Sequence, residues 1–115
     1  MYEYRAKLVK VHDGDTVTLD IDIGFGFCVR KPCRLFGINA PELKDRPVEA
    51  AQSRHRLADL LGDAPASCTT PWSIVCRSHK DATEKYGRIL VTLINGKGVC
   101  VNDRLIEEGF ATKYG

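Results

Sequence analysis

The sequence predicts one α+β domain that is mainly β: a five-stranded barrel with a helix between strands 3 and 4 and a C-terminal helix. Three observations predict it. The 115 residues suffice for one hydrophobic core but not for two, which assigns residues 1–115 to a single domain. Apolar and polar residues alternate with a period of two through several short segments. Turn residues such as Asp13-Gly14 and Asn95-Gly96 separate those segments.

The second predicted strand has the clearest pattern of the five. Polar residues from Thr16 to Asp22 alternate with apolar residues from Val17 to Ile23. Pro32 places an edge or a bulge near the start of the third strand, because proline cannot donate a ladder hydrogen bond. The predicted strands cover residues 3–11, 15–23, 28–38, 72–76 and 88–94, and residues 80–87 are predicted as a loop.

Two helices complete the predicted domain. Pro47 suits the first position of a helix of about 15 residues that ends near Gly62. Its predicted inward face comprises Ala51, Leu57, Ala58, Leu60 and Leu61. Asn102 is the predicted N-cap of the second helix, whose Leu105, Ile106 and Phe110 face inward. This order of strands and helices matches an OB-fold barrel.

The composition limits the classes of function. A hydrophobic fraction of 43% with 28% charged residues is typical of a folded globular domain and unlike a disordered chain. No segment approaches the roughly 18 apolar residues of a membrane-spanning helix, and no secretory leader pattern is present. We therefore expect an intracellular, cytoplasmic monomer with no membrane partner. A net charge of +2 leaves open a local cluster that binds nucleic acid.

The cysteines do not have the spacing of a zinc site. Five cysteines, at positions 28, 33, 68, 76 and 100, form no C-x-x-C pair. We expect reduced thiols that act as small core or strand residues.

Three segments bring charged residues to predicted strand ends. They are Val11-His12-Asp13-Gly14-Asp15-Thr16-Val17, the stretch from Arg34 to Glu42, and Glu84-Lys85-Tyr86-Gly87-Arg88. In this order they resemble the staphylococcal nuclease (thermonuclease) family, and residues 101–111 resemble its closing helix. The resemblance covers about residues 5 to 112. It implies an OB-fold endonuclease that is Ca²⁺-dependent and hydrolyses DNA or RNA with little sequence specificity.

The residue types fit that chemistry without the resemblance. Phosphodiester hydrolysis requires neutralising charge on the phosphoryl oxygens and activating a water molecule. Arg34 and Arg88 suit the first task because guanidinium donors match phosphate oxygens. Asp15 suits a hard cation such as Ca²⁺. The structural alternatives are surface ion pairs for the arginines and a turn role for Asp15 beside Gly14.

The resemblance also implies a role for each site residue. It gives catalytic roles to Arg34, Glu42 and Arg88, with Glu42 activating the water. It gives metal binding to Asp15, Asn39 and the backbone carbonyl of Ala40, an outer-shell role to Asp13, and substrate contacts to Lys85, Tyr86 and Tyr114. Asn39 departs from the family, which has a carboxylate there. Because one negative charge is lost, we expect weaker Ca²⁺ binding or a different ion, such as Mg²⁺ or Mn²⁺.

Three alternatives remain beside the nuclease. An OB barrel can be a non-catalytic module that binds nucleic acid or protein, and the loss of an acid at Asn39 favours that. Glu42-Leu43-Lys44 could be the E-x-K of a restriction-type nuclease, but Pro41 and the absence of a following strand pattern oppose it. A structural or protein-interaction role would leave the charged strand ends unexplained.

Overall fold

The structure is a computed structural model that describes residues 2–41, 45–62, 72–83 and 88–113. The barrel strands are β1 (Tyr2–Asp13), β2 (Thr16–Gly24), β3 (Phe27–Leu35), β5 (Ile74–Thr83) and β6 (Ile89–Ile94). Two short strands, β4 (Ile38–Asn39) and β7 (Thr112–Lys113), form a separate pair. The helices are α1 (Pro47–Gly62) and α2 (Val101–Glu107). Neither helix in these described ranges is long and apolar enough to cross a membrane.

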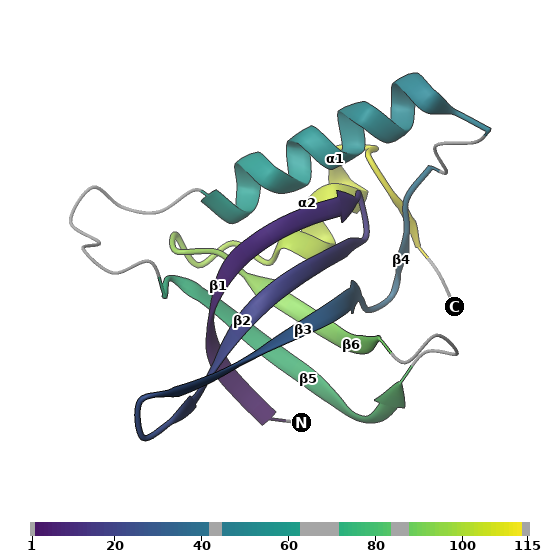
Figure 1. Ribbon diagram of the computed structural model, residues 1–115. Coiled ribbons are helices and arrows are strands. Elements are labelled where there is room, and N and C mark those ends of the chain that lie inside the picture. Colours follow the sequence, from purple (N-terminus) through teal and green to yellow (C-terminus); the bar gives the residue numbers. More distant parts are fainter. Residues whose placement is uncertain (1, 42–44, 63–71, 84–87, 114–115) are drawn as a thin grey trace.

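The five strands close into a barrel in the order β1-β2-β3-β6-β5, with β5 paired back to β1. All pairs are antiparallel except β3–β6, which is parallel. The helix α1 follows the third barrel strand and lies across one end of the barrel, with α2 beside it (Figure 1). The predicted mainly β barrel with two helices is therefore confirmed, and its strand order is that of an OB-like fold.

The barrel interior is apolar, as the alternating pattern predicts. The inward residues of β2, Val17 and Leu19, are fully buried, whereas Thr16 and Asp20 lie on the other face. Burial raises the pKa of the Cys33 and Cys76 thiols to about 12, so both remain protonated and unreactive. The largest fully buried side chains are Leu19, Leu35, Ile38, Leu57, Leu61, Ile74, Leu93 and Leu105.

Two strand predictions need correction. The single strand predicted for residues 28–38 is interrupted at Phe36-Gly37, because Gly37 adopts a φ of +80°, and β4 follows as a separate strand. Residues 80–83, predicted as loop, continue β5, and Thr83 pairs with Ile89 of β6. Pro32 pairs with β2 and comes directly before the three residues of β3 that pair with β6. It therefore lies on an edge part of β3, as predicted for a residue that cannot donate a ladder hydrogen bond.

The helix predictions also need correction: Ala51 and Ala58, predicted to face inward, are half-buried, and Ala50 is buried instead. Cys100, not Asn102, is the N-cap of α2. The Asn102 side chain is buried instead, accepting from the Leu93 N–H at 3.0 Å and donating to the Phe36 and Val91 carbonyls. In α1 the buried face includes Ser53, whose hydroxyl donates to the Phe110 carbonyl. An apolar periodicity cannot detect polar residues that are buried because their hydrogen bonds are satisfied.

Gly14 occupies a close contact between the β1–β2 turn and α1. A Cβ atom built on Gly14 would lie 1.9 Å from Ser53 Oγ and 2.9 Å from Ala40 Cβ. The turn between β1 and β2 therefore needs glycine for close approach to α1. This contact holds the turn, the segment after β4 and α1 together, next to Asp15.

We predict that Gly14→Ala destabilises the fold by about 1–3 kcal/mol, because the added methyl group overpacks a buried contact. The matched control is Gly62→Ala, since a Cβ there meets nothing within 4 Å. Urea unfolding of both variants measures the difference. Equal stability of the two variants would contradict the close contact.

Candidate active site

Asp15 is a buried carboxylate in the turn directly before β2, with 6% of its surface exposed. Its backbone carbonyl accepts the N–H of Leu35 at 2.8 Å, which joins the β1–β2 turn to the end of β3. A charged group at this depth is stable only when it is paired and hydrogen bonded. The surroundings of Asp15 meet that requirement.

Three donors surround the Asp15 carboxylate. Arg34 Nη1 donates to Oδ2 at 2.9 Å, and the Ala40 backbone N–H donates to the same oxygen at 3.1 Å. The Thr16 hydroxyl donates to Oδ1 at 3.0 Å. The predicted metal ligand and the predicted phosphate-binding arginine are thus partners of one another.

Arg34 also spans the turn that follows β3. Its Nη2 lies 3.3 Å from the Ile38 carbonyl oxygen and 3.3 Å from Asn39 Oδ1. The guanidinium therefore stands between the two side chains that the sequence predicts as metal ligands, Asp15 and Asn39. Its side chain is 18% exposed, so solvent still reaches one of its sides.

Arg88 reaches the same place from the segment before β6. Its Nη1 donates to Thr16 Oγ1 at 3.1 Å. Thr16 in turn donates to Asp15, so Arg88, Thr16, Asp15 and Arg34 form one continuous hydrogen-bonded series. Thr16 is not among the predicted site residues, although its place directly after Asp15 at the start of a strand is a usable signal.

The other predicted site residues fall into two groups. Asp13 and Asn39 are exposed, and Ala40 is buried. Asp13 lies at the end of β1, opposite Thr16, which is consistent with an outer position. Glu42, Lys85, Tyr86 and Tyr114 lie outside the described residues.

The described residues offer a cation only part of a coordination shell. Among them, no three His, Cys, Asp or Glu side chains come together in the way a metal site needs. Asp15 Oδ1 accepts one hydrogen bond, from Thr16, and a carboxylate oxygen has capacity for a further interaction. Asn39 and the Ala40 carbonyl could add neutral oxygens. Such a set would suit a hard cation that keeps several water or substrate oxygens only if Arg34 moved from between Asp15 and Asn39.

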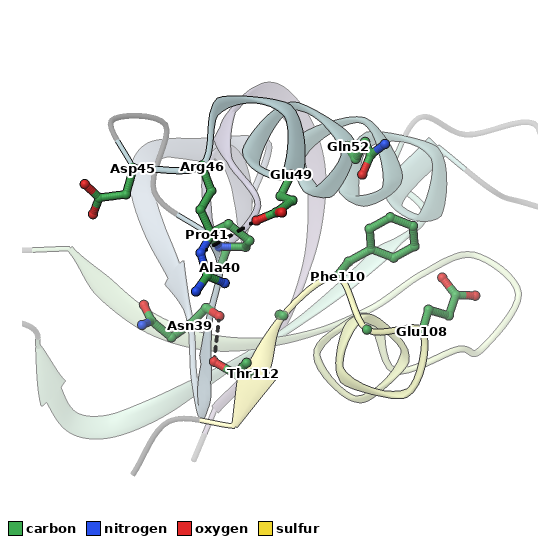
Figure 2. Close-up of a pocket in the computed structure, with 12 residues that line it drawn as sticks. Asn39, Ala40, Pro41, Asp45, Arg46, Glu49, Gln52, Glu108, Phe110 and Thr112 are labelled. Atoms are coloured by element: carbon green, nitrogen blue, oxygen red, sulfur yellow. Dashed lines mark hydrogen bonds and ion pairs between the residues drawn. The ribbon is translucent and has the colours of Figure 1, made fainter.

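A cavity of about 760 Å³ lies beside Asn39, between the first turns of α1 and the residues that follow α2 (Figure 2). Three of its lining side chains are acidic: Asp45, Glu49 and Glu108. Arg46 lies 3.7 Å from Glu49, and a hydrogen bond from Arg56 lowers the pKa of Glu108. This lining carries an excess of negative charge. A phosphate would therefore be repelled by the cavity and would suit the surface beside Arg34 better.

No protein-family model matches the chain, and no curated protein is similar enough to count as a match. The fold and the geometry around Asp15 are therefore the basis for assigning a function.

We predict that Arg34→Met costs about 3 kcal/mol or more of folding free energy, because it leaves the buried Asp15 carboxylate without its cation. The double variant Asp15→Asn/Arg34→Met should recover part of the loss. Urea unfolding of the single and double variants gives the coupling.

Arg30→Met is the matched control for that cycle. Arg30 pairs with Asp20 at a similar distance, 2.8 Å, but its side chain is 65% exposed, so a much smaller loss is expected. Equal losses in Arg34→Met and Arg30→Met would contradict a special role for the Asp15–Arg34 pair.

Proposed function

We propose that this chain is a metal-dependent nuclease of the staphylococcal nuclease-like type that hydrolyses phosphodiester bonds of DNA or RNA with little sequence specificity. The observation that carries the proposal is the convergence of two guanidiniums on adjacent residues: Arg34 on Asp15 and Arg88 on Thr16. Two arginines beside one carboxylate suit a phosphodiester, whose reaction builds negative charge on the phosphoryl oxygens. The motif order described above and the OB-like barrel support the same proposal.

In this proposal the arginines bind the phosphate and stabilise the charge that develops on it. Arg88 is held toward Thr16, which fixes one guanidinium before substrate arrives. Arg34 would exchange its contact with Asp15 for one with a phosphate oxygen. Guanidinium groups suit this exchange because they remain charged and match carboxylate and phosphate oxygens equally well.

The proposed cofactor is Ca²⁺, with Mg²⁺ or Mn²⁺ as other candidates. Asp15, Asn39 and the Ala40 carbonyl are the residues that would hold it. A bound divalent cation supplies charge neutralisation and a more acidic water molecule. Glu42 follows this segment directly after Pro41, and we assign it to orienting or deprotonating the attacking water.

A non-catalytic module that binds nucleic acid or protein is the second candidate. The observation that favours it is the engagement of the Asp15 carboxylate by Arg34 and the Ala40 N–H. In such a module the pair would remain closed and would stabilise the fold. Arg88 and the exposed edge of Arg34 would then attract phosphates without cleaving them.

Digestion of denatured DNA and of RNA with Ca²⁺, Mg²⁺, Mn²⁺ or EDTA separates the two candidates. We expect cleavage with at least one ion, none with EDTA, and a loss of about 10²–10³-fold in Arg88→Ala, as for removal of one transition-state donor. Arg30→Ala, distant from the site, should cleave normally. An absence of cleavage with every ion would reject the enzyme and leave the binding module.

We predict that Asn39→Asp tightens Ca²⁺ binding by roughly tenfold, about 1.4 kcal/mol, because it restores a carboxylate beside Asp15. Isothermal titration calorimetry measures the change. Phe25→Asp adds the same charge at the tip of the β2–β3 hairpin, where Phe25 is 99% exposed, and should have no effect. Unchanged affinity in Asn39→Asp would place Asn39 outside the metal site.

A further inference from the structure

Phe36 and His79 form a stacked aromatic pair on the outside of the barrel. Their ring centroids are 3.8 Å apart and the ring planes differ by 20°. Phe36 nevertheless leaves 44% of its surface exposed. This stacked pair differs from the neighbouring core side chains of β3 and β5, such as Leu35 and Cys76, which point into the barrel and are buried.

Hydrogen bonds fix the backbone of Phe36 and the ring of His79. The Phe36 N–H donates to the Val91 carbonyl at 2.7 Å, and its own carbonyl accepts from Asn102 Nδ2 at 2.9 Å. His79 Nε2 lies 2.8 Å from Thr92 Oγ1. Burial lowers the pKa of His79, so the imidazole stacks as a neutral ring at physiological pH. The pair is therefore preorganised, and little conformational freedom is left to lose on binding.

The pair lies on the same face of the barrel as the two arginines. Thr16 and Arg34 are directly paired across β2 and β3, so their side chains share the outer face. The Phe36 N–H bond to Val91 continues the β3–β6 pairing one residue past Leu35, which keeps Phe36 on the face of Arg34. Arg34 and Phe36 are two residues apart in the chain, which corresponds to about 7 Å where the backbone is extended, a distance on the scale of one nucleotide.

We propose that the Phe36–His79 pair is a stacking platform for one unpaired base of a strand whose phosphate lies at Arg34 and Arg88. The proposal deepens the proposed function and rests on it: it names single-stranded nucleic acid as the substrate class. A base in a duplex is stacked on both sides and cannot present a face to Phe36. Base–aromatic stacking is tolerant of sequence, which fits a site without sequence preference.

The test measures binding in EDTA, so that cleavage does not interfere. A short labelled single strand is compared with the same strand carrying abasic sites and with its duplex, by fluorescence anisotropy. We expect Phe36→Ala and Phe36→Leu to weaken binding of the intact single strand about 5- to 100-fold while leaving the abasic strand unchanged. Phe36→Trp should retain or improve binding. Phe27→Ala, on the hairpin and 67% exposed in the unaltered chain, should change nothing.

Equal changes for the intact and abasic strands, or no change for either, would overturn the platform. Phe36→Leu keeps an apolar side chain of similar size, and thermal unfolding of each variant separates a folding defect from lost stacking. The proposed function is tested separately by the metal-dependent digestion. The two experiments can therefore give different answers. The chain can cleave nucleic acid although Phe36 does not contribute to binding, and it can bind the intact strand through Phe36 without cleaving it. If the unaltered chain binds no single strand, the platform is rejected.

Discussion

The buried carboxylate of Asp15 is the interaction on which the candidate site depends. Its partners come from β2, β3 and the segment after β4, through Thr16, Arg34 and the Ala40 N–H. These segments meet because the turn at Gly14 packs directly against Ser53 and Ala40. The position of a charged group at one end of the barrel is thus set by the packing of a helix that begins more than thirty residues later in the chain. A buried charge needs partners in fixed positions, because the loss of one hydrogen bond or ion pair to it destabilises the folded state.

The same contacts link the two proposed binding events. A phosphate competes with Asp15 for the guanidinium of Arg34, because both are anions of similar geometry. Arg34 leaves Asp15 most readily when another positive charge takes its place beside that carboxylate. In a nuclease, therefore, cation and substrate binding should favour one another, which is a coupling free energy between neighbouring sites. In a binding module Arg34 stays with Asp15, and Arg88 provides most of the attraction. The nuclease and the binding module thus differ in how readily the Asp15–Arg34 ion pair opens.

The sequence predicts the parts of the structure that depend on periodicity and turn residues, and it misses those that depend on long-range contacts. The alternation through β2 and the proline at the start of α1 place these elements correctly. Nothing local marks Asn102 as a buried amide that joins β3 to β6, because a cap and a buried amide use the same residue type. Likewise, the pattern brings Asp15, Arg34 and Arg88 to strand ends, but only the closed barrel pairs Arg34 with Asp15 and Arg88 with Thr16.

Asn39 decides how these charges balance. Its amide oxygen lies 3.3 Å from Arg34 Nη2, where a carboxylate would hold the guanidinium from a second side and give a cation a second charged ligand. The neutral amide accepts a hydrogen bond from Arg34 but brings no charge, so among the described acids Asp15 is the one that offsets the positive charge of Arg34. A neutral residue at this position lowers the affinity expected for a cation and raises the affinity expected for an anion. Binding of a phosphate-bearing strand is then the property that a nuclease would share with a nucleic-acid-binding module, and cleavage would additionally require a cation beside Asp15.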